Sequence, residues 1–243
     1  MMTIQKAIII GASSGIGREL AKILSRNGYE LGLAARRLPE LASLQKELET
    51  KAVVKSIDVT QTDEAIRRLE ELIGELVDVD LIVISSGYGI YNRKLHWERE
   101  KSTIEVNVLG FTAIAGAAYK YFHERGRGHL VGISSIAGIR GSSDMPSYNA
   151  SKAYITNYLE GLRLKAMKTK KSIVVSDIQP GFVDTPMTKA NTGMFWVASV
   201  EDATDQIYRA ILRKKKIAYV TNRWRLVAWA LRLMPDWLYA RIM

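Results

Sequence analysis

The sequence predicts a single α/β domain, in which a doubly wound parallel sheet of about seven strands carries helices on both faces. Short β-branched runs alternate with longer helical patterns, as in crossover units between parallel strands. The expected strands are apolar nearly throughout, which is typical of a sheet covered on both faces. No proline-, glycine- or serine-rich linker divides the 243 residues, so we expect one domain over 1–243.

Each expected element follows from its local pattern. Seven apolar runs predict the strands Lys6–Ile10, Glu30–Ala34, Val53–Ile57, Leu81–Ile84, His129–Ser134, Ser172–Ile178 and Ile217–Val220. Helical patterns between them include Ile16–Asn27, Asp63–Leu76 and Tyr148–Met167. The first of these helices is expected to stop at "SRNG", because Gly28 can take a positive φ.

Composition restricts the functional classes. The chain has no cysteine, so it can form neither disulfides nor thiolate metal sites, and we expect no metal and a reducing compartment. We find no signal-peptide pattern and no apolar run of about 18 residues, and therefore expect a cytoplasmic protein. The net charge is +10, and residues 213–243 hold eight basic side chains and one acid, a net +7.

A glycine-rich loop follows the first expected strand. In "GASSGIGRE", Gly11, Gly15 and Gly17 stand between a strand and a helix, where the backbone can turn sharply and approach a phosphate. We therefore expect the loop residues Gly11, Ser13, Ser14, Gly15, Ile16 and Gly17 to bind a dinucleotide cofactor. The alternative is a tight turn without a ligand.

The end of the second strand indicates which cofactor. Enzymes that prefer NAD place an acid there, but this chain has Ala35 followed by Arg36 and Arg37. A guanidinium suits a 2′-phosphate through charge-assisted hydrogen bonds, and Arg18 could add a second positive charge. We therefore expect NADP(H), with NAD(H) as the alternative cofactor and solvated surface arginines as the alternative interpretation.

A tyrosine and a lysine one helical turn apart provide candidate chemistry. In "SYNASK", Tyr148 and Lys152 share one face of a helix. A free phenol has a pKa near 10, and an ammonium beside it favours the phenolate, so we expect the pKa of Tyr148 to be lowered. The pair could then exchange protons without a histidine. A lone Tyr-x-x-x-Lys can also be an ordinary helix surface.

Six motifs together resemble the short-chain dehydrogenase/reductase family. They are "GASSGIG" (11–17), "DVT" (58–60), "NVLG" (107–110), "SSIAG" (134–138), "SYNASK" (147–152) and "PGFVDT" (180–185), in the family's order and spacing over about residues 5–190. The resemblance implies a Rossmann-like fold and hydride transfer between a nicotinamide and a carbonyl or alcohol. One departure is "ISSG" (84–87), where the family usually has Asn-Asn-Ala-Gly.

The resemblance also implies roles for individual residues. Ser135 would hold the substrate oxygen, Tyr148 would exchange its proton, and Lys152 would bond the nicotinamide ribose. Asn107 would hold a water that links Lys152 to solvent, and Ser134 would be structural. The cofactor would further contact Asp58 and Val59 beside the adenine, Gly87, and Pro180, Gly181, Val183 and Thr185 near the carboxamide.

Substrate specificity is expected from a lid loop at 187–199. Its Met187, Met194, Phe195 and Trp196 suit an apolar lid, with Tyr88 facing it across the cleft, so we expect an apolar or lipid-like substrate. Ordinary packing of the loop is the alternative.

The basic tail at 222–243 is expected to be helical, with one apolar face. This face holds Leu226, Trp229, Ala230, Leu233 and Trp237, with Arg225 and Arg232 on one flank. It could pack on another subunit, cap the substrate cleft, or lie on an anionic membrane as a peripheral contact.

The leading hypothesis is an NADP(H)-dependent oxidoreductase for a small carbonyl or alcohol. A non-catalytic, NADP-binding sensor is the competing class. Nucleic-acid binding through "RKKK" (213–216) is a third interpretation that no nucleic-acid motif accompanies, so we expect no nucleic acid. The resemblance implies a homodimer or homotetramer, formed through helices near Ser102–Tyr121 and Tyr148–Met167.

Overall fold

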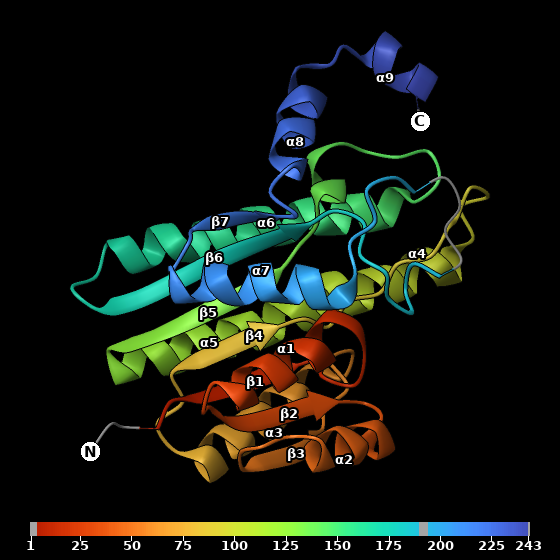
Figure 1. The fold of residues 1–243 in the computed structure, drawn as a ribbon. Helices are drawn as coiled ribbons and strands as arrows, with labels where there is room; N and C mark the ends of the chain where they lie inside the picture. Colours follow the sequence, from red (N-terminus) through yellow and green to blue (C-terminus); the bar gives the residue numbers. More distant parts are fainter. Residues whose placement is uncertain (1–3, 190–193, 243) are drawn as a thin grey trace.

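A seven-stranded parallel sheet forms the centre of the molecule (Figure 1). The computed structural model describes residues 4–189 and 194–242. The strands are β1 Lys6–Ile10, β2 Glu30–Ala35, β3 Ala52–Ser56, β4 Leu81–Ile84, β5 Arg127–Ile133, β6 Ser172–Pro180 and β7 Ile217–Val220. Their order is β3-β2-β1-β4-β5-β6-β7, and every neighbouring pair is parallel. The predicted doubly wound α/β fold is confirmed.

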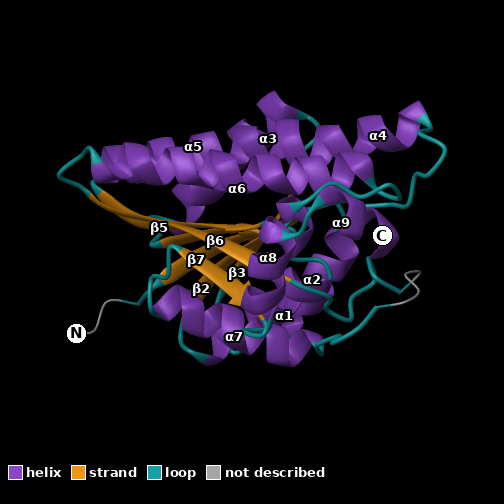
Figure 2. Cartoon of the chain, turned by 90° about the horizontal axis from the view of Figure 1, so that it is seen from above, coloured by secondary structure: helices purple, strands orange, loops and turns teal. Residues whose placement is uncertain are grey.

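Helices cover both faces of the sheet, as Figure 2 shows. One face carries α1 (Gly15–Arg26), α2 (Leu38–Lys46) and α7 (Val200–Leu212), and the other carries α3 (Thr62–Leu76), α4 (Trp97–Ile104), α5 (Phe111–Arg125) and α6 (Pro146–Met167). Strand residues alternate between two apolar cores, with Ile9 in the first and Ile8 in the second. Because both faces are buried, the strands need apolar residues at successive positions.

The boundaries of some elements differ from the sequence-based expectation. Strand β6 continues two residues beyond Ile178, because Gln179 and Pro180 pair with Tyr219 and Val220 of β7. The helix expected over Ser102–Tyr121 is divided into α4 and α5 by a π-helical turn, Glu105–Gly110. A π-helical turn inserts an extra residue into a helix and is frequent at functional sites.

The topology brings the predicted site residues to one edge. β1 and β4 are neighbours in the sheet, but the chain continues from β1 toward one edge, to β2, and from β4 toward the other edge, to β5. A crevice forms outside the carboxyl ends of the strands at such a point. The glycine loop after β1, "ISSG" after β4 and the serines after β5 all lie there.

The tail forms two short helices, α8 (Trp224–Leu233) and α9 (Asp236–Ile242), which extend from the body after β7 (Figure 1). Met234 is extended and Pro235 follows, so the expected helix is interrupted there. Within residues 4–189 and 194–242, no helix is long and apolar enough to cross a bilayer.

Candidate active site

A cavity opens at the carboxyl ends of the strands, and most of the predicted site residues line it. They are Gly11, Ser13, Ser14, Gly15, Ile16, Arg36, Arg37, Asp58, Val59, Gly87, Tyr88, Ser135, Tyr148, Lys152, Pro180, Gly181, Val183, Thr185 and Met187. Gly17, Asn107, Phe195 and Trp196 are not part of this lining as the described residues define it. Four residues of the expected lid, 190–193, lie outside the described part of the chain.

The glycine loop passes very close to its neighbours. Gly11 has a φ of +91°, and a Cβ atom there would lie 2.5 Å from the backbone nitrogen of Ser86. A Cβ atom on Gly17 would lie 2.2 Å from the carbonyl oxygen of Gly11. Helix α1 begins at Gly15, and Gly15 and Ile16 of its first turn line the cavity, where free N–H groups and the helix dipole favour an anion. The loop has the geometry that a phosphate needs.

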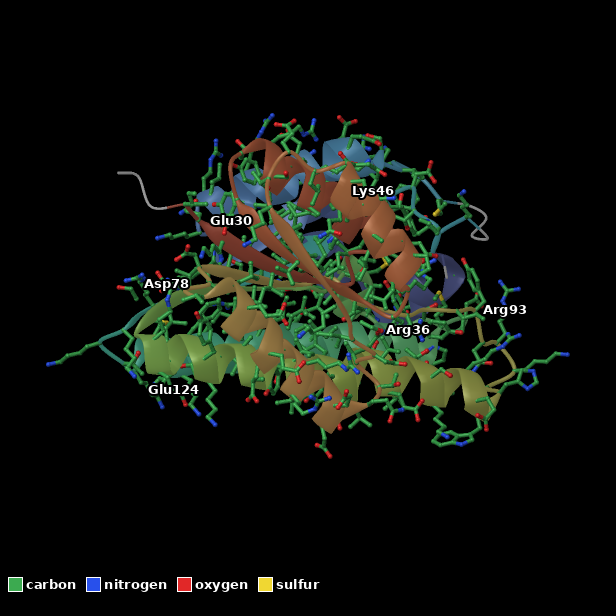
Figure 3. All side chains as sticks on the ribbon, turned by 90° about the horizontal axis from the view of Figure 1, so that it is seen from below. Glu30, Arg36, Lys46, Asp78, Arg93 and Glu124 are labelled. Carbon is green, nitrogen blue, oxygen red and sulfur yellow. The ribbon has the colours of Figure 1, made fainter. Side chains whose placement is uncertain are left out.

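Two arginines stand at the mouth of the cavity beside this loop. The Arg37 guanidinium donates hydrogen bonds to the hydroxyls of Ser13 (3.0 Å) and Ser14 (3.1 Å). Arg36 lines the cavity and lies nearer to the Arg93 side of the molecule than to the Asp78 side (Figure 3). Arg18 instead pairs with Glu47 on the side of α2, so the expected second charge from Arg18 does not reach the cavity.

The two serines after β5 have different surroundings. The Ser135 hydroxyl accepts a hydrogen bond from the backbone N–H of Ala137 (3.1 Å) and lies 3.3 Å from the carbonyl oxygen of Pro180. The Ser134 hydroxyl donates to the buried carboxylate of Asp177, which also accepts from Gln179 (2.6 Å). The hydroxyl of Ser134 is therefore bound to a buried carboxylate in the core. The neighbouring Ser135, which also lines the cavity, hydrogen-bonds to no such carboxylate among the described residues.

Tyr148 and Lys152 lie one turn apart on α6, and both line the cavity. The Lys152 ammonium lies 5.7 Å from the centre of the Tyr148 ring and donates a hydrogen bond to the Ile133 carbonyl (3.0 Å). Burial lowers the pKa of Lys152 to about 8, and the Asp177 carboxylate opposes part of this shift. Burial raises the pKa of Tyr148, and a hydrogen bond with the Ser135 side chain opposes part of this rise.

The expected lowering of the Tyr148 pKa is therefore wrong for this structure. Spacing along the helix places the two groups correctly, but it gives no measure of burial. Here the cost of removing both groups from water dominates their pKa values.

Asn107 lies in the π-helical turn and is completely buried. Its side chain accepts from the backbone N–H of Tyr88 (2.8 Å) and donates to the Tyr88 carbonyl (2.7 Å) and the Ser151 hydroxyl (2.9 Å). Asn107 thus fixes the segment after β4 against α6. Its expected role in holding a water stays a prediction.

Two glycines to which the sequence analysis assigned no role of their own shape the site. A Cβ atom on Gly89 would lie 2.5 Å from Cδ2 of the Tyr148 ring, and one on Gly138 would lie 2.6 Å from the backbone carbon of Lys152. The chain after β4 and the chain after β5 can therefore approach α6 only because these residues lack side chains. The close contacts are between distant segments, so local sequence carried no signal of them.

Replacing Gly89 with alanine is expected to lower kcat by about tenfold to a hundredfold, because a displacement of about 1 Å in a catalytic group has this effect. The cause would be movement of the Tyr148 ring away from the new methyl group. Steady-state kinetics of the variant would measure the change. Gly161→Ala is the control. Gly161 lies on α6 like Tyr148, but a Cβ atom on it would meet nothing within 4 Å. Equal kinetics for both variants would contradict the role of Gly89.

Lys152 is expected to reduce the stability of the folded protein near neutral pH. Its pKa falls from 10.5 to about 8 on folding, so below pH 8 the buried ammonium costs free energy that disappears as pH rises to about 10.5. Lys152→Met should therefore raise the free energy of unfolding near neutral pH by ~1–3 kcal/mol. Chemical denaturation would measure this gain, which should vanish above about pH 10.5.

The exposed Lys120 on α5 provides the control for that measurement. Lys120→Met should leave the free energy of unfolding nearly unchanged at every pH, since its ammonium stays in water. A gain for Lys152→Met that persists at high pH would show that its cause is packing and not charge.

The lid aromatics contact the tail. Phe195 and Trp196 pack around the buried Trp224, with ring centres 5.1 and 5.9 Å away, and both stay about half exposed. The indole of Trp224 also covers Gly181, where a Cβ atom would lie 2.1 Å from the ring. Because Phe195 and Trp196 do not line the cavity, their expected contact with substrate stays a prediction.

The comparisons agree with this geometry. A model of the short chain dehydrogenase family matches residues 5–194. The chain belongs to the short-chain dehydrogenase/reductase family. It is 37% identical to an uncharacterized oxidoreductase of Myxococcus xanthus over 231 residues, covering 93% of this chain and 90% of that one. An uncharacterized oxidoreductase of Mycobacterium tuberculosis is 32% identical over 223 residues, covering 88% and 87%.

Solved structures of short-chain dehydrogenases share the fold. A Burkholderia phymatum family member in complex with NAD aligns with a TM-score of 0.85 at 19% identity, over 94% of this chain and 93% of its own. A Sphingobium yanoikuyae short-chain dehydrogenase in complex with NADPH gives 0.80 at 23% identity, over 96% and 97%. These dehydrogenases bind NAD in one case and NADPH in the other, and this chain is likewise an oxidoreductase of the family.

Proposed function

We propose that this short-chain dehydrogenase interconverts a carbonyl and an alcohol with NADP(H), using Tyr148 as the acid and base. One observation carries the proposal: Ser135, Tyr148 and Lys152 line the same cavity as the glycine loop and Arg36. When bound, a nicotinamide would supply or accept the hydride. The lining supports a dinucleotide there, because the glycine loop and the first turn of α1 (Gly15 and Ile16) border the cavity, and free N–H groups at a helix start favour a phosphate.

Each catalytic side chain has a defined task in this proposal. Ser135 and Tyr148 would hold the substrate oxygen by hydrogen bonds, and Tyr148 would pass its proton to that oxygen during reduction. Lys152, with a pKa of about 8, is close enough to neutral pH to share in proton exchange through the site. Asn107 would keep the segment after β4 fixed while this happens.

The preference for NADP(H) is proposed from the arginines at the mouth of the cavity. Ala35 ends β2 without an acid, so a 2′-phosphate would meet Arg36 and Arg37 and no carboxylate of β2. Arg37 lies within hydrogen-bond distance of the loop hydroxyls, and this supports a phosphate bound beside its positive charge. Such guanidinium contacts discriminate strongly between phosphate and hydroxyl.

An apolar substrate is proposed from the side of the cavity near Tyr148. Tyr88, Val106 and Met187 are among the residues that line this cavity. Aromatic and methionine side chains provide adaptable apolar surface with few fixed polar groups.

A screen of carbonyl compounds with NADPH oxidation as the readout tests the function. We expect turnover of apolar ketones or aldehydes, and faster turnover with NADPH than with NADH. Tight NADPH binding, measured by calorimetry, without turnover of any carbonyl or alcohol would instead identify the non-catalytic sensor.

A further inference from the structure

The α8–α9 arm carries an apolar surface that points away from the body. Leu226, Trp229, Leu233 and Trp237 are 63 to 73% exposed. The inner side of α8 is different, since Trp224 and Ala228 are buried against the body. Spacings of three and four residues place the three exposed positions of α8 on one face. With Ala230, which is also exposed, these are the five residues of the apolar face that the sequence predicts.

The arm is held in place by specific contacts. The Arg140 guanidinium donates to the carbonyls of Leu231 (3.1 Å) and Met234 (2.6 Å), pairs with Asp236 and lies 4.4 Å from the centre of the Tyr239 ring. The Tyr239 hydroxyl donates to the Gly141 carbonyl (2.6 Å). These contacts bind the arm to the body of the protein. The apolar face therefore stays exposed in the folded structure.

Exposed arginines flank this apolar face. Arg223, Arg225, Arg232 and Arg241 are all exposed, and the single acid of the tail, Asp236, is paired with Arg140. Two of these arginines lie against tryptophan rings, Arg223 over Trp196 at 5.1 Å and Arg241 over Trp237 at 5.5 Å. Exposed tryptophans with adjacent arginines suit the headgroup region of a membrane, where indole rings and guanidinium groups both find partners.

Charge decides between the two candidate occupants of the surface. A second copy of the chain would bring the arginines of both arms together, and their mutual repulsion opposes that contact. An anionic lipid surface would attract the same arginines and take up the apolar side chains. Phe195 of the lid, 51% exposed, packs against Trp224 at the start of α8.

We propose that the α8–α9 arm docks this protein on anionic membranes as a peripheral contact. Leu226, Trp229, Leu233 and Trp237 enter the boundary between headgroups and acyl chains, and the flanking arginines bind lipid phosphates. This proposal does not depend on the reaction, because vesicle binding is measured without cofactor or substrate.

Flotation with lipid vesicles tests the docking. The full chain should bind vesicles of phosphatidylcholine with added phosphatidylglycerol, and neither phosphatidylcholine alone nor the anionic vesicles at high salt should retain it. Trp229→Ser combined with Trp237→Ser should weaken binding by about tenfold or more. The matched control is Met167→Ser with Leu212→Ser, which removes two exposed apolar side chains at the far ends of α6 and α7 and should leave binding unchanged.

Retained NADPH binding and an unchanged melting temperature would show that the tryptophan variant is folded. Failure of the full chain to float with anionic vesicles would overturn the proposal, as would equal binding of the two double variants. Concentration-dependent dimerisation that the tryptophan variant loses, without vesicle binding, would assign the surface to a second copy instead.

Discussion

Replacement of Tyr148 with phenylalanine is expected to reduce kcat by about 10²–10⁴-fold, the range that general acid–base catalysis contributes. The substitution removes only the hydroxyl, so the ring can keep its contact with Gly89. Because the glycine loop and the arginines are untouched, the Kd for NADPH should change little. Turnover assays and calorimetric titration with NADPH would measure the two effects separately.

Tyr154, one and a half turns further along α6, provides a matched control. Its hydroxyl bonds to Thr112 (2.8 Å) and the residue is absent from the described lining of the cavity. Tyr154→Phe should keep nearly full activity. Normal turnover in Tyr148→Phe would exclude its role as the acid, and a parallel loss of NADPH binding would indicate a structural cause.

Replacement of Arg36 with aspartate is expected to weaken NADPH binding much more than NADH binding. Loss of a hydrogen bond to a charged group costs about 1.5–3 kcal/mol, which corresponds to roughly 10- to 150-fold in Kd, and the new carboxylate would add repulsion. NADH has a hydroxyl in place of the 2′-phosphate, so its Kd should rise only slightly. Titration of the variant with both cofactors would give the ratio.

Arg26→Asp is the control for that ratio, because Arg26 is exposed near the end of α1 and does not line the cavity. It introduces the same change of charge and should affect both cofactors equally. If Arg36→Asp also weakens NADPH and NADH by equal factors, Arg36 does not recognise the 2′-phosphate.

The fold could be predicted because most of its strands and helices follow from local patterns of apolar residues and glycines. Strand β1 is an apolar run after Lys6 that is followed by Gly11, and α1 begins within the glycine motif, at Gly15. The π-helical turn around Asn107 could not be predicted in this way. Its geometry depends on packing between distant segments, such as Gly110 against Val59, where a Cβ atom would lie 2.6 Å from the Val59 carbonyl oxygen.

The candidate site divides in the same manner. Tyr148 and Lys152 could be paired from their spacing, and the glycine loop from its position after a strand. The contacts of Gly89 and Asp177 could not, because each joins segments far apart in the chain. The direction of the Tyr148 pKa was mispredicted for a related reason: it depends on burial, which only the assembled tertiary structure determines.

A crystal structure with NADP⁺ and a bound alcohol or ketone is the most direct measurement of the proposed chemistry. We expect the hydroxyls of Ser135 and Tyr148 both within about 3 Å of the substrate oxygen, which is the reach that proton transfer requires. The Lys152 ammonium should lie beside the nicotinamide ribose, and Arg36 or Arg37 should contact the 2′-phosphate. A Tyr148 hydroxyl directed away from the substrate oxygen, with another side chain in its place, would contradict the proposed role of Tyr148.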